Sequence, residues 1–275
     1  MLAYVFSLAM RSLRSVLFVF AIIVVICTGL FAPMPGFPGA IAAESTGPDW
    51  SYQTEKGPTH WAELDYSFSL CGKGQSQSPI DLTAAEAADL VNPEFHYRAV
   101  PLNLLNNGHT VQIPYAPGSY LTLAGKQYNL LQFHFHSPSE HSVEGHSQAA
   151  ELHLVHRSDA GELAVVAVML QSGETSKTGG AYLELTRNLP EKAGDKVRTG
   201  KTISAQALLP ETMTTYRYSG SLTTPPCTES VTWLVMSDPV VLPADQIAKY
   251  EALLNHNNRP RQGLNSRSIM IDTSP

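Results

Sequence analysis

Two short stretches of this 275-residue chain concentrate side chains that commonly bind metals. Residues 131–141 read LQFHFHSPSEH and contain His134 and His136, while residues 149–156 read AAELHLVH and contain His153. Side chains alternate along a β-strand, so His134 and His136 share one strand face. If the two stretches pair with their histidine faces aligned, three imidazoles converge on one point. Three neutral imidazole nitrogens with an open fourth position are typical of a catalytic zinc site.

Gln132 and Glu151 each lie two residues before one of these histidines, on the same strand face. An amide or carboxylate in that place can accept the outward N–H of a ligand imidazole, and we expect both to orient the cluster. An alternative stays open at this point. H-x-H patterns also arise without function, and these histidines could be ordinary core or surface residues.

The elements that must position these side chains are mainly strands. Apolar runs bounded by Gly, Ser, Asn or Asp predict strands at 121–123, 128–136, 149–156, 163–170, 231–235 and 240–242. Asn107 and Gly108 predict a hairpin turn, because both residue types tolerate positive φ.

Helical patterns are short and peripheral. They cover 181–188, 244–254 after Pro243, and 84–90, where Thr83 and Glu86 form a potential capping box. We therefore expect a β-dominated mixed α/β fold, with one large twisted, mostly antiparallel sheet and short peripheral helices.

The N-terminal residues differ in composition from the rest of the chain. Arg11 and Arg14 precede an apolar run at 16–32, and the Pro/Gly-rich segment at 33–43 ends in small residues. This order predicts a secretory signal peptide within 1–43, and hence an exported protein that is periplasmic or secreted. An uncleaved membrane anchor is the alternative, because the apolar run is close to the minimum length for a membrane span.

Residues 44–275 contain no second linker, internal repeat or low-complexity tract, and they predict a single domain. The chain has a formal net charge of −6 and no basic run. We therefore expect no nucleic-acid partner and, unless the signal is uncleaved, no membrane partner. The sequence does not distinguish a monomer from an oligomer.

The chain has 3 cysteines, and Cys27 lies within the N-terminal apolar run. Cys71 and Cys227 remain in the exported part, where an oxidising compartment favours a single disulfide between them. Two buried free thiols are the alternative.

Several motifs together resemble the α-class carbonic anhydrases. They are QSPIDL at 77–82, NNGH at 106–109, QFHFH at 132–136, SEH at 139–141, ELHLVH at 151–156, GSLTTPPC at 220–227 and VTW at 231–233. They occur in the family's order and spacing from Trp50 to about Arg267, nearly the whole predicted domain. The resemblance implies this family's fold, a Zn²⁺ ion held by the three clustered histidines, and a zinc-bound hydroxide that attacks carbon dioxide to give bicarbonate.

Three further residues match catalytic positions of that family. Thr223 matches the threonine that accepts a hydrogen bond from the hydroxide, and Glu140 matches the buried glutamate that takes the threonine's own proton. A threonine whose proton is committed can only accept, which orients the hydroxide. His109 matches the proton shuttle, a role suited to an imidazole that titrates near neutral pH.

The resemblance also implies the surroundings of the substrate. Thr224 matches a residue near bound substrate or product, and the apolar wall for carbon dioxide would consist of Val155, Val165, Leu222 and Trp233. The family further implies the Cys71–Cys227 disulfide and cis peptide bonds before Pro79 and Pro226.

Other functions remain as alternatives. A relative that has lost catalysis would be a binding or zinc-handling protein, although such relatives typically lack a zinc histidine. A zinc esterase is a second alternative, but no G-x-S-x-G nucleophile motif is present. His141 matches a structural histidine, and no role is expected for His60, His96, His146, His156 and His256.

Overall fold

Strands form most of the regular structure in the computed structural model, which describes residues 49–174 and 179–274. The main strands are β1 (Glu86–Ala88), β2 (Glu94–His96), β3 (Val100–Asn106), β4 (Val111–Pro114), β5 (Tyr120–Leu123), β6 (Lys126–His136), β9 (Ala150–Arg157), β10 (Leu163–Ser172), β11 (Lys196–Ile203), β12 (Thr215–Ser221), β13 (Glu229–Met236), β14 (Val240–Leu242) and β15 (Met270–Asp272). A separate small hairpin consists of β7 (Ser142–Val143) and β8 (His146–Ser147).

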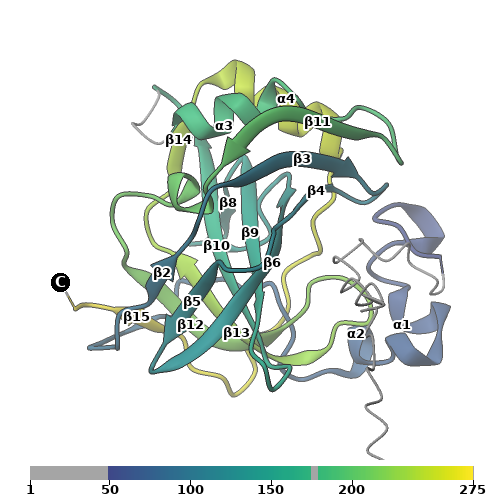
Figure 1. The fold of residues 1–275 in the computed structure, drawn as a ribbon. Coiled ribbons are helices and arrows are strands. Elements are labelled where there is room, and N and C mark those ends of the chain that lie inside the picture. Colours follow the sequence, from purple (N-terminus) through teal and green to yellow (C-terminus); the bar gives the residue numbers. More distant parts are fainter. Residues whose placement is uncertain (1–48, 175–178, 275) are drawn as a thin grey trace, which may run out of the picture. The chain divides into compact units, whose positions relative to one another are not determined.

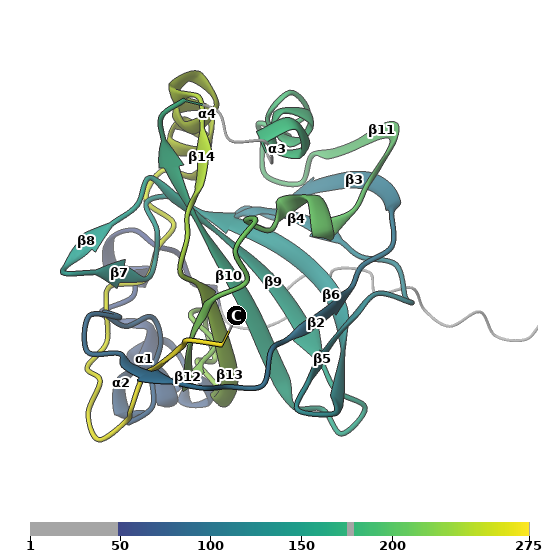
Figure 2. The same cartoon turned by 90° about the vertical axis from the view of Figure 1, so that its left-hand side faces the viewer.

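The described helices are short and lie outside the sheet. They are α1 (Trp61–Leu64), α2 (Leu70–Lys73), α3 (Gly179–Thr186) and α4 (Ala244–Leu254), with the 3₁₀ turns η1 (Thr54–Lys56), η2 (Tyr66–Phe68) and η3 (Ala205–Leu208). In two views, α3 and α4 lie together at one end of the long strands, and α1 and α2 lie toward the other (Figure 1, Figure 2).

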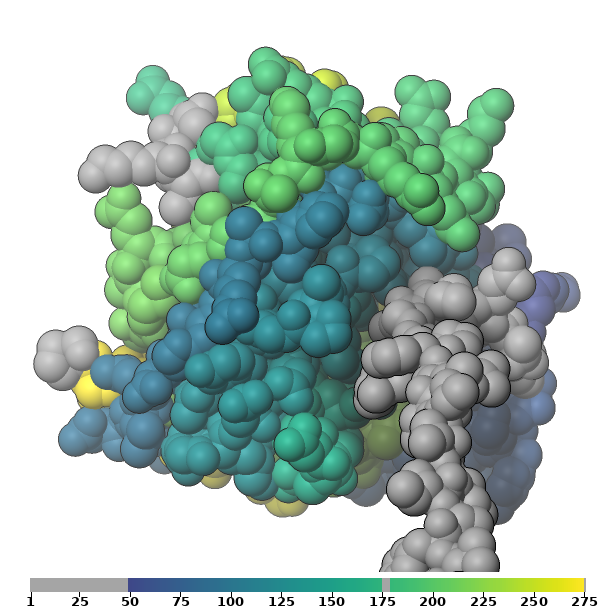
Figure 3. All heavy atoms as spheres, viewed as in Figure 1, coloured from purple at the N-terminus to yellow at the C-terminus, as the bar shows by residue number. Residues whose placement is uncertain are grey.

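The main sheet has 13 strands, with the central order β1-β15-β12-β13-β10-β9-β6-β4-β3-β11. Neighbours are antiparallel except for β1 with β15, β10 with β13 and β10 with β14. On the face seen in Figure 3, the side chains of β11 lie directly against those of β3, its partner at the end of that order. The predicted fold class is therefore confirmed.

The six strands predicted from apolar patterns all form, with ends that differ by a few residues at most. The helices predicted at 181–188 and 244–254 are confirmed as α3 and α4. The predicted signal peptide and Pro/Gly-rich segment at 1–43 lie outside the described residues. Within the described ranges, every helix is too short or too polar to cross a membrane.

The predicted hairpin turn joins β3 to β4, but its two key residues act differently. Gly108 has a φ of 88°, whereas Asn107 is not in the positive-φ region. Asn107 instead contributes its side chain, because Oδ1 accepts hydrogen bonds from the amides of His109 and Thr110, each at 2.9 Å. The turn is thus stabilised by a side-chain acceptor as well as by glycine.

The helix predicted at 84–90 does not form, and this prediction was wrong. Asp81 accepts hydrogen bonds from both the amide and the hydroxyl of Thr83, so Thr83 does not cap a helix. Glu86 instead starts β1 and donates its amide to Ile269 at 2.9 Å, beside the C-terminal strand β15. Pairing with a distant strand outweighs the weak local helix preference.

Alternation along β6 and β9 separates the core from the histidines. Phe133 and Phe135 on β6 are fully buried and lie opposite Leu154 and Leu152 of β9. Tyr250 of α4 packs on Phe135, with ring centroids 4.8 Å apart. The apolar faces of both strands are therefore committed to the main core, which leaves their other faces for polar side chains.

A small cluster of Trp61, Phe68, Cys71 and Cys227 anchors the N-terminal helices. Cys71 and Cys227 form a disulfide that joins positions 156 residues apart, as predicted. Cis peptide bonds precede Pro79 and Pro226, as the resemblance implied, and a third, not anticipated, precedes Pro138.

Reduction of the Cys71–Cys227 disulfide should lower the free energy of unfolding by about 2–5 kcal/mol, because it releases a long loop constraint in the unfolded chain. Thermal and denaturant unfolding with and without reductant measure the effect. A variant with both cysteines replaced by Ser should not respond to reductant. Equal melting temperatures for the oxidised and reduced wild type would contradict this expectation.

Candidate metal centre and active site

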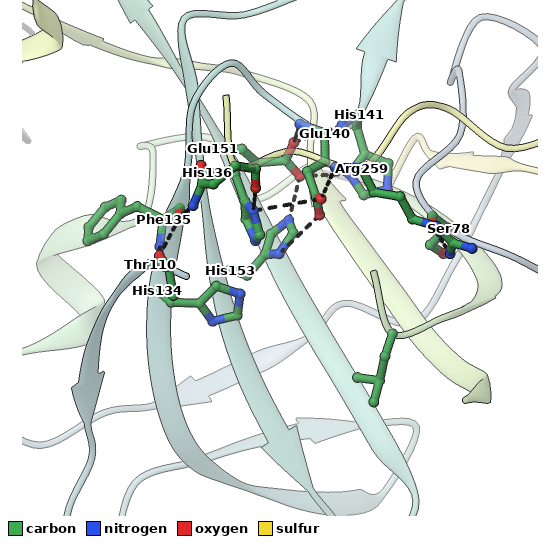
Figure 4. Close-up of polar contacts among 12 residues, drawn as sticks. Ser78, Thr110, His134, Phe135, His136, Glu140, His141, Glu151, His153 and Arg259 are labelled. Carbon is green, nitrogen blue, oxygen red and sulfur yellow. Dashed lines mark hydrogen bonds and ion pairs between the residues drawn. The ribbon is translucent and has the colours of Figure 1, made fainter. Parts of the chain in front are cut away.

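The antiparallel pairing of β6 and β9 brings the three candidate ligands together. His134 lies directly opposite His153, and His136 follows two residues later on β6. One nitrogen from each ring lies within 4.8 Å of those of the other two. The ring centroids are 4.6–5.3 Å apart, and Figure 4 shows the three imidazoles side by side. The histidine-bearing faces of β6 and β9 are therefore aligned, the condition on which the predicted cluster depended.

Each imidazole has its outward nitrogen committed to a fixed acceptor. The distances are 2.9 Å from His134 Nδ1 to Gln132 Oε1, 2.7 Å from His136 Nδ1 to the Asn257 carbonyl, and 2.9 Å from His153 Nε2 to Glu151 Oε1. Because an outward N–H donates to each acceptor, the inward nitrogen of each neutral ring carries the lone pair.

The electrostatics keep the cluster neutral. Burial, together with the neighbouring imidazoles, lowers the pKa of His134 well below its ordinary value. Burial also lowers the pKa of His136 to about 4 and lowers the pKa of His153, where the Glu151 charge opposes it. His136 Nε2 is buried without a hydrogen-bond partner among the described residues. Three neutral imidazoles with such an unpaired nitrogen fit a zinc ion.

Glu151 is a saturated acceptor behind the cluster. Its Oε2 accepts from the amides of Glu140 and His141 at 2.8 Å each, and its Oε1 accepts from His141 Nδ1 at 2.6 Å as well as from His153. Burial raises its pKa, but these histidines outweigh burial and hold the pKa well below its usual range. His141 also bonds Tyr218 at 2.7 Å, so both ring nitrogens of this buried histidine have partners.

Glu140 is equally buried but has fewer donors. Its Oε1 accepts from the Arg259 amide at 2.8 Å, while Oε2 has no hydrogen-bond partner of ordinary geometry in the described ranges. Burial raises the pKa of Glu140 to about 7, although His153 and the nearby Thr223 hydroxyl lower it. Oε2 lies 3.9 Å from His153 Nδ1, so the carboxyl lies beside the ligands.

His109 lies on the turn between β3 and β4 and is half-buried. Its ring stacks on Trp50, with centroids 3.9 Å apart and an interplanar angle of 7°. Burial lowers the pKa of His109, and the Asp49 charge opposes that shift. At neutral pH the ring is therefore mainly neutral and able to accept a proton.

The residues expected to form an apolar wall lie in one cluster. The strand register places Val155 of β9 beside Val165 of β10, and Val165 beside Trp233 of β13. Leu222 packs against the same cluster and stays partly exposed. Thr224 is half-buried on the loop after β12, where its carbonyl accepts the Cys227 amide at 2.8 Å.

Two residues in the segment after α4 contribute to the site and were not predicted. Asn257 is 2% exposed, and its carbonyl orients His136. Arg259 is 1% exposed, and its amide holds Glu140, while its guanidinium donates to the carbonyls of Cys71 and Ser78 at 2.8 Å each. A charged residue before proline gives no sequence signal of burial.

The histidines without an expected role lie elsewhere. His60, His96, His146 and His256 are exposed. His156 is buried, and its Nε2 lies 2.8 Å from the Tyr97 hydroxyl.

Known proteins provide an independent comparison. The family model of the eukaryotic-type carbonic anhydrases matches residues 56–273. A carbonic anhydrase from Nostoc sp. is 43% identical over 228 residues, which cover 81% of this chain and 85% of that protein.

Two solved structures have the same fold. A hyperthermostable carbonic anhydrase from an active hydrothermal vent chimney is 41% identical with a TM-score of 0.77, over 82% of this chain and 100% of its own. The α-carbonic anhydrase from Thermovibrio ammonificans, in complex with the inhibitor sulfanilamide, is 38% identical with a TM-score of 0.78, over 82% and 99% respectively. Since the matched region includes both histidine-bearing strands, this chain belongs to the α-class, eukaryotic-type carbonic anhydrase family, whose reaction is the hydration of carbon dioxide.

Proposed function

We propose that this chain catalyses the reversible hydration of carbon dioxide to bicarbonate and a proton, at a zinc ion bound by His134, His136 and His153. The convergence of three neutral imidazoles, with one nitrogen from each ring within 4.8 Å of the other two, carries the proposal. Zinc in a three-histidine site lowers the pKa of a bound water to about 7, a value characteristic of carbonic anhydrases themselves.

The ligand rings are held by hydrogen bonds to the protein itself. Gln132, Glu151 and the Asn257 carbonyl each accept an outward N–H, which fixes both ring orientation and tautomer. Loss of such an acceptor typically weakens metal affinity about 10–100-fold. Glu151 suits this role best, because its other lone pairs are already bonded to His141 and to backbone amides.

Thr223 is proposed to order the attacking water. The Glu140 carboxyl near it has an unpaired Oε2 within the described residues. A threonine hydroxyl that gives its proton to this oxygen can only accept a hydrogen bond from the water, which turns a water lone pair toward carbon dioxide. The role requires ionised Glu140. The positive charge of a zinc ion bound to the neighbouring histidines would favour that form.

His109 is proposed to carry the released proton to buffer. Its lowered pKa, caused by burial, keeps the ring ready to accept a proton at neutral pH. Stacking on Trp50 restricts the ring, and the side chain stays partly exposed to solvent.

The apolar cluster beside the histidines is proposed to hold carbon dioxide, and Thr224 to contact the substrate or the product anion. Val155, Val165, Leu222 and Trp233 share one cluster next to the polar ligands. Apolar lining with a few polar groups suits a small nonpolar substrate that becomes an anion.

The alternative of a binding or zinc-handling protein is less well supported. Such a function would need the three ligands but would leave Thr223, Glu140 and His109 without a role. We also propose export to the periplasm or the medium, since the Cys71–Cys227 disulfide suits an oxidising compartment.

Removal of zinc by a chelator should abolish carbon dioxide hydration, and added zinc should restore it, because no described side chain can replace the metal. Stopped-flow hydration assays on residues 44–275 measure both steps. Sulfanilamide, which the Thermovibrio ammonificans relative binds, should inhibit only the zinc-loaded form. Slow hydration by a folded, fully zinc-loaded protein would favour the binding function instead.

Thr223→Ala should slow hydration about 10²-fold, since one positioned hydrogen-bonding group is lost at the reacting atoms. Zinc content should not change, because all three ligands and their acceptors remain. Thr223→Ser is the matched control and should keep most activity, as it retains the hydroxyl. Unchanged turnover in Thr223→Ala would remove this role.

His109→Ala should lower kcat about 10–10²-fold in weak buffer while leaving kcat/KM nearly unchanged. Bicarbonate leaves before the proton does, so proton transfer limits kcat alone. Added imidazole should restore kcat, and the exposed-site control His96→Ala should behave as wild type. A kcat that does not depend on buffer in either protein would argue against a shuttle.

A further inference from the structure

The segment after α4 returns Asn257 to the space between the metal centre and the turn that carries His109. Asn255 and His256 both adopt left-handed backbone conformations, with φ of 46° and 59°. These two residues reverse the chain direction at the helix end. Asn257 then lies buried, at 2% exposure.

Apart from its backbone N–H, every polar group of Asn257 has a hydrogen-bond partner in or beside the site. Its carbonyl accepts His136 Nδ1 at 2.7 Å, and its side-chain Oδ1 accepts the Ser137 amide at 2.9 Å. Its Nδ2 donates to the carbonyls of Phe135 at 2.9 Å and His109 at 3.0 Å. The partners fix the orientation of the side-chain amide, because the nitrogen faces two acceptors and the oxygen faces a donor.

The His109 turn has few other attachments to the sheet. The Asn107 bonds lie within the turn itself. Thr110 Oγ1 donates to the Phe135 carbonyl at 2.6 Å, a contact visible in Figure 4. Behind the turn is a cavity of about 150 Å³, lined by Gly108, His109, Thr110, Leu253 and Leu254 among others. Apart from the stacking of the His109 ring on Trp50, hydrogen bonds therefore hold the turn more than packing does on the side of this cavity.

We propose that the Asn257 side chain is a positioning residue for the proton shuttle. Its backbone carbonyl orients a metal ligand, while its side-chain nitrogen holds the backbone of His109, so one residue sets the distance between the two. This inference rests on the proposed function, in which His136 binds zinc and His109 carries the proton. Proton transfer is sensitive to small displacements of the carrier, whereas the hydration step does not involve His109.

The Asn257→Ala variant separates the two duties, because it keeps the backbone carbonyl and removes the side-chain amide. In weak buffer, kcat should fall about tenfold, less than the ~10²-fold expected for loss of a positioned acid–base group. The high-pH plateau of kcat/KM and the zinc dissociation constant should each stay within about twofold of wild type, because the ligands and their acceptors are intact. Imidazole should restore kcat.

A double-mutant cycle identifies the path of the effect. If Asn257 acts through His109, Asn257→Ala should cause no further loss of kcat in a His109→Ala background. Asn258→Ala is the matched control, since its side chain makes no hydrogen bond in the described structure, and it should behave as wild type in all assays. Additive losses in the double variant would overturn the proposal.

Other outcomes also decide the proposal. Parallel losses in kcat, kcat/KM and zinc affinity would show a merely structural role, and an unchanged kcat would show none. If Asn257→Ala does not fold, Asn257→Asp retains the volume and the Ser137 acceptor but removes both donors, and the same comparison applies. A wild type whose kcat lacks buffer dependence would refute the shuttle itself, whereas normal buffer dependence without coupling to Asn257 would refute only this inference.

Discussion

The register between β6 and β9 is the constraint on which the site depends. It pairs His134 with His153 and, on the opposite face, Phe133 with Leu154 and Phe135 with Leu152. A shift of one residue in either strand would turn its histidines into the core and its apolar side chains toward the site. The burial of the apolar face therefore stabilises the fold and aligns the ligands at the same time.

The carboxyls of Glu140 and Glu151 are both buried, but their pKa values shift in opposite directions. Glu151 receives four donors, and its pKa stays well below the usual range. Burial raises the pKa of Glu140 to about 7; its Oε1 has one donor, and its Oε2 has no hydrogen-bond partner of ordinary geometry within the described residues. The histidines that face Glu151, more than the depth of burial, make it a fixed anion, whereas Glu140 can exchange a proton with a neighbour.

Irregular segments outside the sheet hold the remaining groups of the site in place. Arg259 links Glu140 to the carbonyl of Cys71, and Cys71 is joined by its disulfide to Cys227 on the loop that follows Thr223. Asn257 in turn contacts both the end of β6 and the His109 turn. The strands supply a rigid face for the ligands, and these loops bring the remaining groups to it from three parts of the chain.

Alternation in the sequence alone determined which side chains share a strand face, so the three histidines with Gln132 and Glu151 could be predicted as one group. Family motifs then implied roles for Thr223, Glu140 and His109. Strand pairing and register were decided only by the tertiary structure, as were β1 in place of a helix and the contributions of Asn257 and Arg259. Local periodicity reflects contacts between near neighbours in the chain, whereas register depends on pairing between separate strands. The positions of β1, Asn257 and Arg259 depend on hydrogen bonds to segments more than a hundred residues away.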